Sequence, residues 1–138
     1  LTEPLKNQAK YLHNNYNYYK YNEFSALQNF LNHLPAINKK ISNIPFVKIR
    51  FHPSENKKKY HKLLKRYKEF QLRTSKEKEL VKDIVSSDFI VGCETAALVV
   101  GLIAKKKVFC TIPKNGKKSS LPYKNIMPIS KLINHFDA

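Results

Sequence analysis

Short apolar runs alternate with amphipathic segments from residue 46 to residue 112. Such runs, when they are only a few residues long and rich in Val, Ile and Phe, are typical of β-strands. Predicted strands cover residues 46–51, 70–73, 89–91 and 108–112. Between them, apolar residues recur at helical spacing and predict helices over residues 56–67, 74–85 and 94–104. This alternation predicts an α/β, Rossmann-like fold, a parallel sheet with helices on both faces.

Two of these helices carry patterns that indicate which residues face the core. Residues 56–67 have apolar positions at i, i+3, i+4 and i+7, namely Tyr60, Leu63, Leu64 and Tyr67. Residues 74–85 begin with Thr74 and Glu77, which have the spacing of a capping box. The inward residues of this second helix are predicted to be Leu80, Val81, Ile84 and Val85.

The segment before this region has a weaker pattern. Residues 1–22 interleave tyrosine with asparagine without a clear period, so we expect a loop-like segment or a short irregular helix. Residues 1–5 also fit the end of a first strand. Apolar residues at helical spacing then predict a helix over residues 23–34, which Pro35 is expected to stop.

The segment after residue 113 is expected to be a loop that covers residues 114–129. It contains Gly116, Pro122 and Pro128, which favour turns over regular structure. A last short helix is predicted at residues 130–136.

Length and composition predict one domain, residues 1–138. A hydrophobic content of 42% excludes a disordered chain. The longest apolar run, residues 96–104, is far shorter than the roughly 20 residues that a membrane-spanning helix needs. The two cysteines, Cys93 and Cys110, stand in apolar surroundings, which suits a reduced, cytoplasmic protein. Because Leu1 rather than Met comes first, we expect a fragment of a longer chain.

The chain is strongly basic, with 26 Lys and Arg against 10 Asp and Glu and a formal net charge of +16. Of the basic residues 23 are Lys, and there are also 13 Asn. An AT-rich genome produces this excess at solvated positions, while a phosphate-rich partner or an anionic membrane surface is the alternative explanation. Charge alone therefore does not decide the function.

Candidate chemistry lies where the predicted strands end, because ligands of open α/β sheets bind beyond the carboxyl ends of the strands. His52, Pro53 and Ser54 follow the strand at residues 46–51. His52 is either a surface histidine or a donor to a phosphate oxygen, and Ser54 is able to cap the next helix. Thr95 follows the strand at residues 89–91 and is either a helix cap or part of an anion site.

Several other chemistries are disfavoured by the sequence. There is no Gly-x-Gly-x-x-Gly motif, and only three glycines occur, so a dinucleotide cofactor site is not expected. The histidines His13, His33, His61 and His135 lack metal-ligand spacing, and we expect no metal and no cofactor.

Two motifs carry a resemblance to a known family. An Arg-x-His-Pro motif lies within residues 47–55, and residues 88–96 follow the pattern Asp-x-x-x-Gly-x-x-Thr-Ala from a strand into a helix. In this order and spacing they resemble the bacterial sialyltransferases and polysialyltransferases, with related capsule and lipooligosaccharide glycosyltransferases of GT-B architecture. The match covers residues 45–113.

The resemblance implies the donor-binding half of a GT-B glycosyltransferase. Its donor is a nucleotide sugar, with CMP-sialic acid favoured, and its acceptor is a bacterial surface glycan. His52 is then the catalytic residue that contacts the donor phosphate, and Thr95 replaces a phosphate-binding Ser or Thr. Glu94 stands where the family often has a second hydroxyl, which leaves a ribose or base contact as its expected role.

The resemblance also implies partners. The family's catalytic base is an acidic residue of an N-terminal domain, which we expect as a missing partner of this fragment. We also expect a cytoplasmic location, and the basic charge makes peripheral contact with anionic lipid at the inner face of the cell membrane a further expectation.

Two other functions remain open on the sequence. A module for single-stranded nucleic acid would stack bases on the tyrosines of residues 11–21 and follow the backbone with Lys57, Lys58, Lys59, Lys62 and Lys65, although we do not favour a nucleic-acid partner. An epimerase-like fold for nucleotide sugars is the third alternative. No further acid or base candidate lies near His52, which argues against an epimerase.

Overall fold

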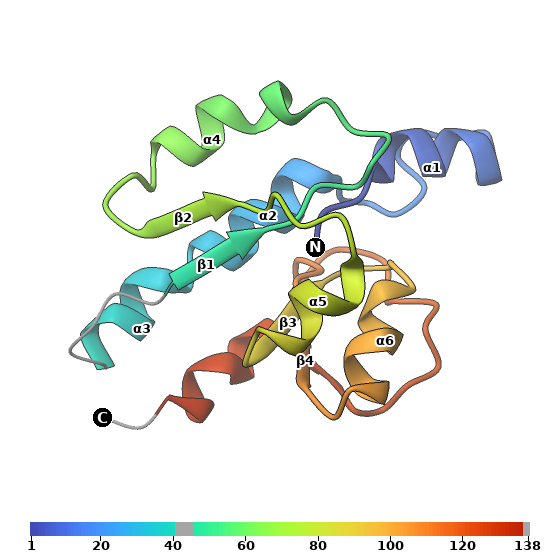
Figure 1. Cartoon of the computed structure of the whole chain (residues 1–138). Helices are drawn as coiled ribbons and strands as arrows, with labels where there is room; N and C mark the ends of the chain where they lie inside the picture. Colours follow the sequence, from blue (N-terminus) through green and yellow to red (C-terminus); the bar gives the residue numbers. More distant parts are fainter. Residues whose placement is uncertain (41–45, 137–138) are drawn as a thin grey trace.

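The computed structural model describes residues 1–40 and 46–136, and it has the predicted α/β fold (Figure 1). The strands are β1 (Phe46–Ile49), β2 (Gln71–Thr74), β3 (Phe89–Gly92), β4 (Lys107–Cys110) and β5 (Ile126–Pro128). The α-helices are α1 (Leu5–His13), α2 (Glu23–Leu31), α3 (Leu34–Lys40), α4 (His61–Lys65), α5 (Leu80–Val85) and α6 (Ala97–Ile103). Two 3-10 helices are η1 (Lys57–Tyr60) and η2 (Ile129–His135).

The strands form two small parallel sheets. β1 pairs with β2, with Phe46 opposite Gln71, and the second sheet has the order β3-β4-β5. Parallel pairing and the α/β class are confirmed, and the arrangement is consistent with a Rossmann-like fold. The single sheet that the sequence predicts is divided into two within the described residues.

The core is built from helices that pack on both sheets. Figure 1 shows α4 over β1 and β2, while α5 and α6 lie beside β3 and β4. Tyr60 is fully buried and packs between the rings of Phe24 and Phe51, 5.4 and 5.1 Å away between centroids. Val108 and Phe109 are adjacent in β4 and both buried, because β4 is the central strand of its sheet and is covered on both faces.

Residues 1–22 are not simply loop-like, since α1 forms two turns of regular helix within them. Leu5 and Ala9 lie one turn apart and are both buried, and the helix ends at Asn14 in the left-handed conformation, with φ 51°. The sequence signal is weak because the other side chains of α1 are polar or exposed. Residues 1–4 belong to no assigned helix or strand.

The expectation that residues 114–129 form a loop is wrong at its end. Ile126, Met127 and Pro128 form β5, which pairs with β4, and η2 begins at Ile129. Proline is tolerated here because β5 is an edge strand, whose outer side needs no backbone donor.

Two helix boundaries also differ from the prediction. The helix predicted to stop at Pro35 ends at Leu31, and Pro35 instead lies in the first turn of α3, where its missing N–H costs nothing. Thr74 ends β2 and caps no helix, because α5 begins only at Leu80.

The predicted stripe of residues 56–67 faces the core as expected, although the segment is divided between η1 and α4. In α5 the prediction holds for Ile84, but Val81 and Val85 are exposed. Within the described ranges, no helix is both long and apolar enough to cross a membrane.

Candidate functional site

The His52 side chain is held by Ser54 in the loop that follows β1. The backbone N–H of Ser54 donates to Nδ1 of His52 at 3.2 Å, and the Ser54 hydroxyl lies 2.8 Å from the same nitrogen. A ring nitrogen that accepts a hydrogen bond does not carry the proton, so the neutral ring carries it on Nε2. Nε2–H is therefore the donor that His52 can offer to a ligand.

Ser54 does not cap the following helix, contrary to the expectation from its position. Asn56 does so instead, because its side-chain oxygen accepts from the backbone N–H of Lys58 at 3.0 Å. The hydroxyl of Ser54 is committed to His52. Pro53 is exposed and lies in the turn between His52 and Ser54.

The buried carboxylate of Glu55 holds this loop in place. This residue was not singled out from the sequence. Glu55 accepts from the hydroxyl of Thr2 at 2.6 Å, from the backbone N–H of His52 at 3.3 Å and from the hydroxyl of Tyr60. Lys59 lies 2.6 Å from it as an ion pair. In the sequence, the i, i+4 spacing of Glu55 and Lys59 is the feature that indicates this ion pair.

The surroundings of Glu55 favour its ionised form. Burial alone would raise the pKa of Glu55, but hydrogen bonds from Lys59, Thr2 and Tyr60 outweigh burial and hold the pKa below its usual value. The backbone N–H of His52 therefore donates to a carboxylate of the protein.

Thr95 lies between β3 and α6 and is half-buried. Its hydroxyl oxygen accepts from the backbone N–H of Ala97 at 3.2 Å, in the manner of a helix cap. The hydrogen of that hydroxyl is not used in this contact. Thr95 is therefore still able to donate to a ligand.

His52 and Thr95 follow strands of different sheets, β1 and β3, and line one open pocket of about 620 Å³. The structure thereby brings together the two residues that the motifs single out, and Glu94 with them. Pro53 and Ser54 lie outside the lining.

Residues from the first 22 positions of the chain also line this pocket. Asn7 and Gln8 of α1 supply amide groups, and Tyr11 and Tyr19 supply aromatic rings. Sequence reasoning assigned these tyrosines to a rival function, because nothing local shows that α1 folds back beside residue 52.

The carboxylates of Glu94 and Glu3 also line the pocket, and neither is a group that binds an anion. Both oxygens of Glu94 accept from Ser120, from its backbone N–H and, for one oxygen at 2.7 Å, from its hydroxyl. Glu3 is buried, accepts from the backbone N–H of Glu94 at 2.6 Å, and has its pKa raised by burial to about 7. Near neutral pH, Glu3 therefore carries only part of a negative charge.

A second cavity, of about 460 Å³, lies between the two sheets and includes neither His52 nor Thr95. Across residues 1–40 and 46–136, no group of three or more His, Cys, Asp or Glu side chains is placed to hold a metal ion. No protein-family model, curated protein or solved structure matches the chain.

Proposed function

We propose that this chain is the donor-binding part of a bacterial surface-glycan glycosyltransferase and takes a nucleotide sugar in the pocket of His52 and Thr95. One observation carries the proposal. The two motif residues, 43 positions apart in the sequence, line a single pocket at the carboxyl ends of two parallel strands. That edge is where open α/β sheets bind nucleotides.

In this proposal His52 donates from Nε2 to a phosphate oxygen of the donor. The Ser54 contacts hold the ring, and the Glu55 anchor holds its backbone, so that the donor group is already oriented before the nucleotide binds. Thr95 adds a neutral hydroxyl donor in the same pocket. As the bond between sugar and phosphate breaks, these donors stabilise the charge that collects on the leaving phosphate.

The α1 side of the pocket suits the nucleoside. Asn7 and Gln8 carry amides that both donate and accept, as a pyrimidine edge requires. Tyr11 is 88% exposed, so its ring is accessible for stacking. CMP-sialic acid is the favoured donor because the motifs resemble sialyltransferases, and the same resemblance assigns the catalytic base to a second domain.

A nucleic-acid-binding function is less well supported by the contacts of its proposed residues. Tyr18 stacks on His13 with 3.5 Å between ring centroids, and the ammonium of Lys117 lies 3.7 Å from the centroid of Tyr18. Lys59 is paired with Glu23 and Glu55. These side chains are engaged within the chain rather than presented to a strand of bases.

Calorimetric titration with CMP and with a mixed-sequence oligonucleotide, each at low and high salt, distinguishes the two functions. We expect saturable CMP binding that changes little with salt, and weak oligonucleotide binding. Oligonucleotide binding that is tighter than CMP binding and falls steeply with salt would contradict the proposal, because phosphate contacts along a strand release counterions.

A further inference from the structure

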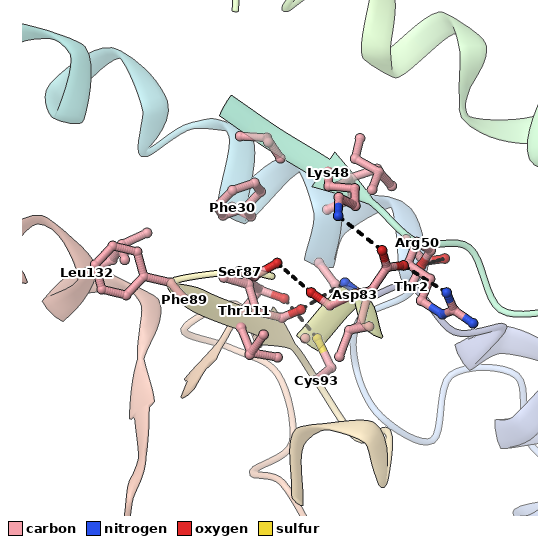
Figure 2. Close-up of a pocket in the computed structure, with 18 of the residues that line it drawn as sticks. Thr2, Phe30, Lys48, Arg50, Asp83, Ser87, Phe89, Cys93, Thr111 and Leu132 are labelled. Carbon is pink, nitrogen blue, oxygen red and sulfur yellow. Dashed lines mark hydrogen bonds and ion pairs between the residues drawn. The ribbon is translucent and has the colours of Figure 1, made fainter. Parts of the chain in front are cut away.

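The edges of the two sheets face each other across the 460 Å³ cavity. β1 pairs only with β2, and β3 pairs only with β4, so each of these two strands is an edge of its sheet within the described residues. Residues of both strands line the cavity. Figure 2 shows this cavity, with Lys48 and Arg50 on the β1 side and Phe89 and Cys93 on the β3 side. Buried strand edges are unfavourable unless another strand satisfies their N–H and C=O groups.

The first residues of the chain bridge the two edges as a central strand does. The Leu1 nitrogen donates to the carbonyl of Val91 in β3, and the Thr2 N–H donates to the carbonyl of Arg50 directly after β1, each at 2.9 Å. Successive residues of a strand direct their backbone groups to opposite sides. Leu1 and Thr2 follow this alternation, and Figure 1 shows the N-terminus between the two sheets.

The direction of this bridge determines where a longer strand would lie. Leu1 and Thr2 contact the carboxyl ends of β3 and β1. A parallel strand that leads into Leu1 would therefore run back between Phe46–Ile49 and Phe89–Gly92, along the cavity that these strands line.

The lining shows which side chains such a strand would carry. Phe30, Leu34 and Ile37 come from α2 and α3, and Ile84 comes from α5, so helices from different parts of the chain supply apolar surface. Three of the charged side chains at the cavity are paired with one another, since Asp83 lies 2.7 Å from Arg50 and 3.1 Å from Lys48. An apolar segment fits this lining, as in the buried strand β4.

We propose that this slot binds one further β-strand, an extended apolar segment that runs parallel to β1 and β3 and leads into Leu1. The strand joins the two sheets into one, in the order β2-β1-new strand-β3-β4-β5. Numbered along the chain with the new strand first, that order is 3-2-1-4-5-6, which is the common doubly wound order. The proposal does not depend on the proposed function.

The added strand would also complete the edge on which the candidate site lies. In the 3-2-1-4-5-6 order, ligands bind where the strand order reverses, between the first and fourth strands. Thr2 and Glu3 lie at that point, and they contact the backbone N–H groups of His52 and Glu94. Filling the slot would hold these two residues in register.

The test compares two extended forms of the whole chain by hydrogen–deuterium exchange. One carries five alternating Val and Ile residues joined to Leu1. The matched control has the same length, with two of the five residues replaced by proline, which removes backbone donors but keeps the segment apolar.

The expected protection is specific to alternate residues. Ile49 and Gly92 carbonyls already bond to Ser75 and Thr111 on the far sides of their strands, so the alternate residues Lys48, Phe89 and Val91 face the slot. We expect the amides of Lys48, Phe89 and Val91 to exchange at least tenfold more slowly with the Val/Ile extension than with the proline control. Equal exchange of these amides in the two forms would overturn the proposal, as would slowing that extends equally to the outer strand β5.

Discussion

The carboxylate of Glu3 accepts a hydrogen bond from the backbone N–H of Glu94 at 2.6 Å, which joins the first residues of the chain to the end of β3. Glu3 is only 4% exposed, and burial raises its pKa to about 7 from the 4.5 of an unburied glutamate. The folded state therefore binds a proton that the unfolded state has released over most of the range between these two values.

This shift predicts that stability falls as pH rises from about 4.5 to 7, since the folded protein holds more protons than the unfolded chain in that window. The full effect is about 3 kcal/mol for a shift of this size. Glu3→Gln keeps the acceptor oxygen and removes the titration. The difference in unfolding free energy between the two proteins, measured with urea from pH 4 to pH 8, should grow in favour of Glu3→Gln. A constant difference across that range would contradict the raised pKa of Glu3.

Glu3 also predicts how the pocket responds to charge. At pH 8 its carboxylate is ionised and repels a bound phosphate, whereas at pH 5.5 it is largely neutral. Glu3→Gln should tighten CMP binding at pH 8 and change it little at pH 5.5, as measured by calorimetry at constant salt. Equal effects at both pH values would show that Glu3 does not face the ligand.

Glu55 is predicted to be the structural support of the His52 loop. Glu55→Ala removes the acceptor for Thr2, Tyr60 and the His52 N–H, and it should cost about 1–3 kcal/mol of stability for the buried donors left unpaired. The variant should also lose CMP affinity. Glu69→Ala, at an exposed residue, is the matched control and should change neither quantity.

Tyr21 is predicted to carry an unfavourable hydroxyl. Its side chain is 8% exposed, and its hydroxyl has no hydrogen-bond partner within the described residues. Tyr21→Phe removes the polar atom and keeps the ring, so the protein should become more stable by about 1 kcal/mol. Chemical denaturation measures this directly. A loss of stability would show that the hydroxyl has a partner after all.

The strands of the fold were predictable because their signals are local. Residues 89–91 are a continuous apolar run and residues 108–112 are mostly apolar, as buried parallel strands require, and β3 and β4 occupy nearly these positions. β5 was missed because three residues, one of them proline, carry no period. The division into two sheets was missed because pairing between distant strands leaves no trace in either strand's own sequence.

Half of the candidate site was predictable for a similar reason. His52 and Thr95 follow β1 and β3, and an α/β pattern of parallel strands indicates that such residues lie at one edge, where the structure has them line one pocket. The role of Glu55 as an anchor and the approach of Tyr11 depend on contacts with Thr2 and on the packing of α1, which are long-range. No pattern within a few residues encodes such contacts.

The most direct test of the account is the CMP affinity of His52→Ala, compared with His61→Ala at the same salt and pH. His61 is exposed in α4 and does not line the pocket, so it controls for the loss of an imidazole. His52→Ala should weaken binding by about 1.5–3 kcal/mol, the range for hydrogen bonds to charged groups, and leave the melting temperature nearly unchanged. Equal CMP affinity in the two variants would contradict the claim that His52 holds the donor phosphate.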